Sequence, residues 1–132
     1  MSYNRRYFKE YSKRNRAAIS ARQKKWREEN REHVRESKQN WRQRLKLEVL
    51  SHYSKGKLRC ACCGTEGTVF LTLDHIKGGG NRHRKEVGGS MMYKYLIRVG
   101  YPLGYQVLCW NCNAAKHILG KCPHTSVTRI KS

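Results

Sequence analysis

Four cysteines in two identical spacings could bind a metal ion. Cys60 and Cys63 form one Cys-x-x-Cys pair, followed directly by a glycine, and Cys109 and Cys112 form a second pair in VLCWNCNAAK. Two such pairs supply the four soft thiolates of a closed tetrahedral zinc site. The spacing therefore predicts one structural zinc ion bound by Cys60, Cys63, Cys109 and Cys112.

Two further cysteines stand outside these pairs. Cys62 could replace a neighbour in a Cys-x-Cys pairing, and GKCPH offers Cys122 and His124 as a rival half-site. The simpler interpretation of Cys62 and Cys122 is that they are thiols without a metal. We expect reduced cysteines throughout, because the chain shows no export signal and reducing compartments favour metal ligation over disulfides.

An aspartate and a histidine are adjacent at Asp74 and His75, in FLTLDHIKGGGN. Neighbouring side chains leave a regular strand on opposite faces, so these two could serve one site only at a strand end or a bulge. The glycines 78 to 80 supply that break. His75 can accept a proton from water near neutral pH. Asp74 and Asn113 offer hard oxygens suited to Mg²⁺, so the chemistry available is metal-assisted hydrolysis.

The elements that must position these residues can be read from the C-terminal half. TVFLTLDH, residues 68–75, and YQVLC, residues 105–109, have the β-branched and aromatic composition of strands. A short helix is expected from residue 111 or 112 to about Leu119, ended by Gly120. Between the strands lies an insertion with a glycine loop, the basic run NRHRK, and a helix that Ser90 can cap and that ends near Gly100.

Composition and charge narrow the partners. The 132 residues contain 29 Lys and Arg against 9 Asp and Glu, a formal net charge of +20, and the mean hydropathy is -0.88. Such a polar chain can form only a small hydrophobic core, and a bound metal ion can supply the missing folding free energy. The positive charge predicts a polyanionic binding partner, and nucleic acid is the first candidate. A membrane is not expected as a partner, because no apolar run approaches the length of a spanning helix.

The N-terminal segment carries most of this charge. Residues 1–59 hold 19 Lys and Arg and 6 Asp and Glu, and from Arg5 to about Tyr53 the residues are mostly helix formers, which predicts one long helix. Pairs such as Glu10 with Arg14 support it. Its last turns carry an apolar stripe that could dock on the zinc-containing core. The stripe consists of Trp41, Leu45, Val49 and Tyr53.

A weak fifteen-residue repeat precedes that stripe. Asn15 recurs as Asn30, and Tyr11 precedes Trp26 by the same step. Two interpretations stay open: a basic arm that contacts phosphates, or a solvated charged helix. DNA contacts are expected from the arm and from two places in the C-terminal half. The expected residues are Arg16, Arg27, Arg31, Arg42, Arg82, His83, Arg84 and Lys116.

The motifs resemble those of the zinc-containing HNH, or ββα-metal, endonucleases, especially small phage-encoded ones. LTLDHI, QVLCWNCN and GKCPH carry the resemblance, which covers residues 58–124. It implies that Asp74 and Asn113 bind the catalytic Mg²⁺ or Mn²⁺, that His75 is the general base and that the zinc is structural. The family's central Asn is not evident before the second Cys-x-x-Cys, where LGYQVLC stands, so Asn113 is taken as the Asn of the motif.

The expected fold class is therefore α+β: a basic helical DNA-binding arm, residues 1–57, and a small zinc-stapled ββα-metal domain with a helical insertion, residues 58–132. The resemblance implies a Mg²⁺-dependent endonuclease of duplex or branched DNA, in the cytoplasm of a bacterial host if phage-encoded. Two alternatives stay open. One is a zinc-containing nucleic-acid-binding protein without catalysis; the other is a nuclease component of a DNA-packaging assembly that works with other phage proteins.

Overall fold

Two asparagines interrupt the basic N-terminal segment in the computed structural model, which describes residues 4–125. The segment forms α1 (Arg5–Arg14), α2 (Arg16–Glu29) and α3 (Arg31–Tyr53), so the prediction of one continuous helix was wrong. Asn15 has φ −101° and ψ 14°, and Asn30 has φ −112° and ψ 35°. Both residues therefore leave the helical conformation.

The interruptions have a common cause in the side chains of the two asparagines. The amide Nδ2 of Asn15 donates to the carbonyl of Tyr11 at 2.9 Å, and that of Asn30 donates to the carbonyl of Trp26 at 2.8 Å. Each carbonyl also accepts the backbone N–H of the same asparagine. Such side-chain bonds compete with regular helix geometry. The fifteen-residue sequence repeat thus has a structural counterpart, a helix break four residues after Tyr11 and four residues after Trp26.

The chain divides into two compact units, Met1–Trp41 and Arg42–Ser132. This division falls within α3, earlier in the chain than the boundary expected at residue 57. In the first unit, α1 and α2 have no buried residue, and Tyr11 and Trp26 are about half exposed. The predicted pair of Glu10 with Arg14 is present at 3.4 Å, on the surface, where such pairs contribute little to stability.

The last turns of α3 belong to the second unit and contribute to its core. Val49 and Leu50 are fully buried, and Leu45 and Tyr53 are half-buried. The apolar stripe was thus predicted correctly for Leu45, Val49 and Tyr53, whereas Leu50 lay outside it. Lys46 adds a link by donating to the carbonyl of Thr68 at 2.7 Å.

A two-stranded antiparallel hairpin forms the centre of the second unit. It pairs β1 (Leu71–His75) with β2 (Tyr105–Cys109), in a register that runs from Leu71 opposite Cys109 to His75 opposite Tyr105. β1 is shorter than predicted because Phe70 donates its N–H to Gly67 in a turn. Leu71, Val107 and Leu108 are buried beside Leu50 and four of the cysteines.

Short helical elements flank the two strands. The insertion contains α4 (Gly80–Val87), the 3₁₀ turn η1 (Gly89–Met91) and α5 (Met92–Arg98), and β2 leads into α6 (Trp110–Leu119), which ends at the left-handed Gly120 as predicted. The run NRHRK is part of α4 rather than of a loop, and Ser90 lies in η1 instead of capping α5. A second 3₁₀ turn, η2 (Pro123–Thr125), follows α6.

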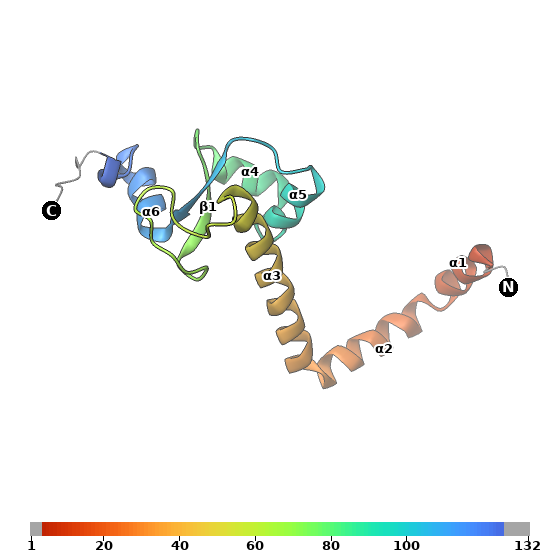
Figure 1. The fold of residues 1–132 in the computed structure, drawn as a ribbon. Helices are drawn as coiled ribbons and strands as arrows, with labels where there is room; N and C mark the ends of the chain where they lie inside the picture. Colours follow the sequence, from red (N-terminus) through yellow and green to blue (C-terminus); the bar gives the residue numbers. More distant parts are fainter. Residues whose placement is uncertain (1–3, 126–132) are drawn as a thin grey trace. The chain divides into compact units, whose positions relative to one another are not determined.

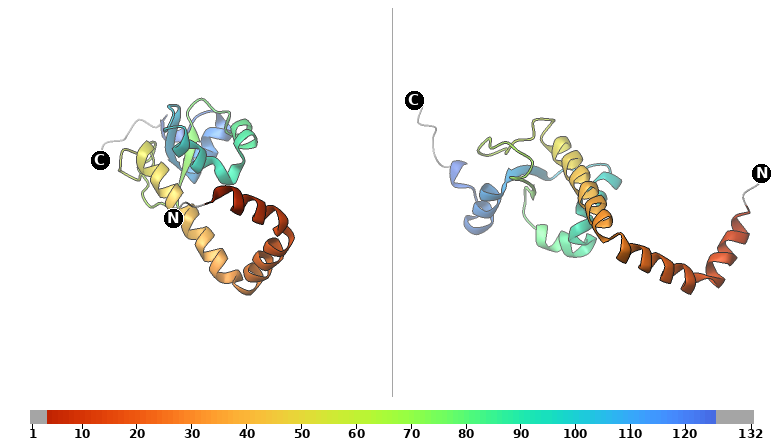
Figure 2. Two further views of the ribbon diagram at one scale, coloured as in Figure 1. Left: turned by 90° about the vertical axis from the view of Figure 1, so that its right-hand side faces the viewer. Right: turned by 90° about the horizontal axis from the view of Figure 1, so that it is seen from below.

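These helices lie on two sides of the hairpin. Figure 1 shows α6 on one side of β1 and α4 with α5 on the other, and the views of Figure 2 show α4 and α5 (green to cyan) next to each other. The end of β1 therefore meets two layers of helices. Within residues 4–125, no helix combines the length and the apolar character needed to cross a membrane.

Candidate metal centre and catalytic residues

The first cysteine pair lies in a tight turn between residues 59 and 66, which we call the knuckle. An isolated bridge pairs Arg59 with Glu66, and the N–H of Cys60 donates to the carbonyl of Thr65 at 2.8 Å. Gly64 turns the chain with φ +78° and donates its N–H back to Cys60, a backbone conformation that favours glycine. The N–H of Ala61 donates to Val107 and so ties the knuckle to β2.

The second pair lies where β2 becomes α6. Cys109 is the N-cap of α6, and its sulfur accepts the N–H of Cys112 at 3.4 Å. Cys112 lies in the first turn of that helix and is fully buried. Hairpin pairing and helix capping therefore fix both sulfurs without a contribution from loop residues.

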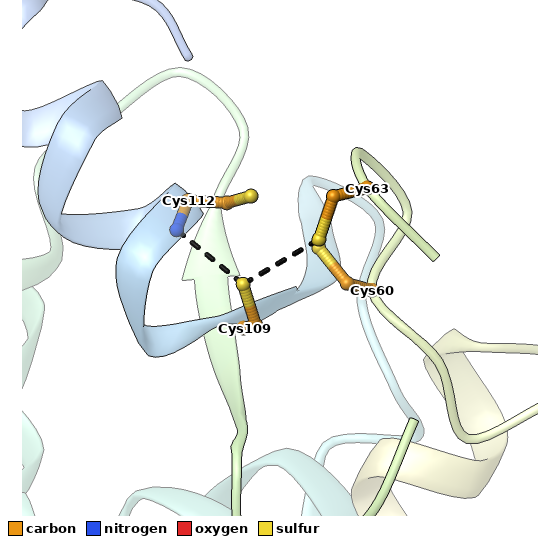
Figure 3. A group of neighbouring side chains, drawn as sticks. All are labelled: Cys60, Cys63, Cys109 and Cys112. Atoms are coloured by element: carbon orange, nitrogen blue, oxygen red, sulfur yellow. Dashed lines mark hydrogen bonds between the residues drawn. The ribbon is translucent and has the colours of Figure 1, made fainter. Parts of the chain in front are cut away.

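The structure brings the four predicted cysteines together. Their ligand atoms all lie within 4.8 Å of one another, and Figure 3 shows the side chains converging from the knuckle and from the start of α6. The sulfurs of Cys63 and Cys109 are 3.7 Å apart, and two thiolates of a tetrahedral zinc site with 2.3 Å bonds are separated by about 3.8 Å. Hydrogen bonding by Thr65 lowers the pKa of Cys63 to about 6. This group could hold a metal ion such as zinc.

A second group of possible ligands lies beside the first. The ligand atoms of Cys62, Cys112, Cys122 and His124 also lie within 4.8 Å of one another. Cys112 belongs to both groups. Sequence reasoning had offered Cys122 and His124 only as a rival half-site, because nothing in the local spacing shows that Cys62 faces them.

Asp74 lies in a polar cluster between β1 and α6. Its side chain is largely buried, and its Oδ2 accepts from Nε2 of Gln106, the residue opposite it in the hairpin, at 2.7 Å. The same oxygen accepts from Nζ of Lys116 at 2.5 Å, and Lys116 also donates to the carbonyl of His75 at 2.8 Å. One face of the hairpin end is thus connected to α6.

His75 contacts a different set of residues. Its Nε2 lies 3.0 Å from Nδ1 of His83 on α4, and that nitrogen lies 3.1 Å from the hydroxyl of Tyr105. Gly80 lies against the imidazole, since a Cβ added there would be 3.0 Å from Nδ1 of His75. Burial lowers the pKa of His75, and the nearby His83 acts in the same direction. The neutral imidazole is therefore favoured.

Asn113 lies on α6, between Cys112 and Lys116, and is half-buried. Among the described residues, Asp74 has Gln106 and Lys116 as polar partners, and no hydrogen bond joins it to Asn113. The helix that carries Asn113 nevertheless reaches the end of β1 one turn later, at Lys116. Gln106 and Tyr105 were missed from the sequence, although strand pairing opposite Asp74 and His75 could have indicated them.

The residues expected to contact DNA fall into two groups. His83 and Lys116 are half-buried and bonded to other residues of the site. The arginines are exposed, three of them in the first unit and three in the second. They are Arg16, Arg27 and Arg31, and Arg42, Arg82 and Arg84.

No protein-family model, curated protein or solved structure matches this chain.

Proposed function

We propose that the protein is a metal-dependent DNA endonuclease of the HNH, or ββα-metal, type, with a structural zinc in the four-cysteine group. The observation that carries the proposal is the position of α6, the helix of Asn113, which packs against β1 and reaches Asp74 and His75 at the end of that strand. An antiparallel hairpin leads through a cysteine pair into that helix. The order of strand, excursion, strand and helix is the one that the resemblance implies.

The site offers the groups that phosphodiester hydrolysis requires. Burial lowers the pKa of His75 and so favours the neutral imidazole, the form that can take a proton from an attacking water. One of its ring nitrogens is engaged by His83, which would hold the ring and its tautomer. Asp74 and Asn113 would hold a Mg²⁺ or Mn²⁺ ion, whose charge would stabilise the developing negative charge on the phosphate. Both hydrogen bonds of Asp74 use Oδ2, so Oδ1 is the oxygen suited to a metal.

The basic surface supports a polyanionic substrate. The exposed arginines of α1 to α4 and the net charge of +20 supply sequence-independent attraction to phosphates. In this proposal the arginines of both units bind DNA, and the second unit cleaves it. A partner protein is not needed for the isolated chain to act, which distinguishes it from a component active only within a packaging assembly.

One observation favours a second function, nucleic-acid binding without catalysis. The ammonium group of Lys116 lies 2.5 Å from Asp74 and already neutralises the carboxylate that a catalytic metal would need. In a protein that only binds nucleic acid, the ion pair of Lys116 with Asp74 can stay intact, because no metal has to bind the carboxylate. The two functions differ in whether the purified chain hydrolyses DNA.

Relaxation of supercoiled plasmid by the purified chain, with and without Mg²⁺, tests the proposal. We expect Mg²⁺-dependent nicking that His75→Ala reduces by at least about 100-fold, with unchanged DNA affinity. Asn113→Ala should also lose activity, and added metal should restore part of it. His117→Ala is the matched control, because His117 is exposed on the same helix outside the site. Binding without any nicking, or full activity in His75→Ala, would contradict the nuclease assignment.

A further inference from the structure

Three side chains outside the four-cysteine group meet beside it. Cys62 comes from the knuckle, whereas Cys122 and His124 come from the segment after α6, about sixty residues later in the chain. Together with Cys112 they form a Cys₃His set, one of the ligand sets of structural zinc sites. Local sequence cannot produce this convergence, because the two segments meet only through the packing of α6 on the hairpin.

The distances within this set match zinc coordination. Nδ1 of His124 lies 3.4 Å from the sulfur of Cys112 and 3.3 Å from the sulfur of Cys122. In a tetrahedral site with zinc–sulfur bonds of 2.3 Å and a zinc–nitrogen bond of 2.0–2.1 Å, a sulfur and a nitrogen are about 3.5 Å apart. An S–H···N hydrogen bond would explain either contact alone. It would not explain why a fourth ligand, Cys62, lies within the same 4.8 Å.

Burial adds a second argument. Cys112 is 0% and Cys122 is 6% exposed, and both belong to the main core cluster. His124 closes the set from the exposed side. A soft metal ion would be largely shielded from water and held by ligands whose backbones are already fixed by α6 and by the knuckle.

We propose that the protein binds two zinc ions in one cluster. The first is held by Cys60, Cys63, Cys109 and Cys112, as in the proposed function, and the second by Cys62, Cys122, His124 and Cys112. The sulfur of Cys112 bridges the two ions, since a thiolate has lone pairs for both. Two Zn²⁺ ions neutralise four of the six thiolate charges, and the strongly basic chain favours the remaining negative charge.

The second ion has a structural consequence that the first lacks. It joins the segment after Gly120 to the knuckle, so that α6 is held at both of its ends. The N-terminal end is held by Cys109 and Cys112, and the chain beyond the C-terminal end is held by Cys122 and His124.

Zinc counting by native mass spectrometry of the full chain tests the cluster. We expect two zinc ions in the wild type and one in both Cys62→Ser and His124→Ala. The control His117→Ala should retain two, because His117 belongs to neither group. His124→Ala is informative even if Cys62→Ser fails to fold, since His124 is exposed, and far-UV circular dichroism verifies the fold of each variant.

Each other count contradicts a different statement. One zinc in the wild type that His124→Ala retains would overturn the second site while leaving the four-cysteine zinc intact, and no zinc would overturn both. Two ions in Cys62→Ser and His124→Ala would show that these residues are not ligands.

The bridge has its own measurement. The chain reconstituted with ¹¹³Cd should give two resonances that split each other through the sulfur of Cys112. Two unsplit resonances would overturn the sharing of Cys112.

Discussion

The ammonium group of Lys116 links the last two residues of β1 to α6, at 2.5 Å from Oδ2 of Asp74 and 2.8 Å from the carbonyl of His75. The Asp74 and Lys116 side chains are 11% and 21% exposed, so the pair is only weakly screened by water. A divalent metal and this lysine would act on the same carboxylate. Substitution of Lys116 therefore tests the proposed dependence on a divalent metal.

Lys116→Gln should lower the Mg²⁺ concentration for half-maximal plasmid nicking by about tenfold, because a competing positive charge is removed from Asp74. The variant should also be less stable without metal, since one partner of a largely buried pair is lost. Mg²⁺ should then raise its melting temperature more than that of the wild type. Lys121→Gln is the control, as Lys121 is exposed. An unchanged Mg²⁺ dependence would show that Lys116 does not compete with the metal.

Gly80→Ala should separate the position of His75 from the stability of the fold. Alanine favours a helix more than glycine does, and the φ of Gly80 is not in the left-handed region. The new Cβ would lie 3.0 Å from Nδ1 of His75 and should displace the imidazole. We expect an unchanged free energy of unfolding and a nicking rate reduced about tenfold.

The exposed neighbour Asn81 provides the control for this substitution. Asn81→Ala should leave both the rate and the free energy of unfolding near the wild-type values. If Gly80→Ala cleaves plasmid at the wild-type rate, the contact of Gly80 with His75 has no part in the reaction.

Removal of residues 1–40 should weaken DNA binding and reduce its salt dependence. On duplex DNA, the logarithm of affinity falls with the logarithm of salt concentration by about 0.9 for each phosphate neutralised. The triple substitution of Arg16, Arg27 and Arg31 by Gln keeps the aromatics and should reduce this slope by up to about 3. Fluorescence anisotropy at several salt concentrations measures it. A wild-type slope in the truncated chain would assign the first unit to a solvated helix without DNA contacts.

Tyr53 should make the second unit sensitive to alkaline pH. Its hydroxyl donates to the carbonyl of Pro102 at 2.8 Å. Burial, with smaller contributions from Tyr105 and Tyr101, raises its pKa from 10.0 to about 12. A folded-state pKa above the unfolded value contributes stability that is complete below pH 10 and is lost as pH rises through about 12.

Tyr53→Phe tests this contribution. The variant should lose about 1 kcal/mol of stability at pH 7, from the missing hydrogen bond. Its free energy of unfolding should then fall less steeply than that of the wild type above pH 10, as measured by urea unfolding at several pH values. Tyr11→Phe, an exposed change in the first unit, should not alter the slope. Equal alkaline slopes for wild type and Tyr53→Phe would contradict the role of this hydroxyl.

Features that depend on residues close together in the chain could be predicted from the sequence alone. β2 and the end of α6 at Gly120 were predicted correctly, because strand composition and a helix-ending glycine are local properties. The convergence of Cys60, Cys63, Cys109 and Cys112 was also predicted, since two Cys-x-x-Cys pairs commonly supply the four ligands of one zinc ion. The helix breaks at Asn15 and Asn30 were missed although their cause is local. The surrounding residues are mostly helix formers and predicted a continuous helix, whereas the two asparagine side chains bond to carbonyls of the preceding turn.

Only the tertiary structure decided which distant residues meet. Lys116 reaches Asp74 because α6 packs back along the hairpin, and His83 reaches His75 because α4 covers the opposite side. Cys62 meets Cys122 and His124 because the packing of α6 brings the segment after that helix next to the knuckle. These contacts join segments that are far apart in the chain, and their geometry follows from the packing of helices on a sheet, which no short stretch of sequence encodes.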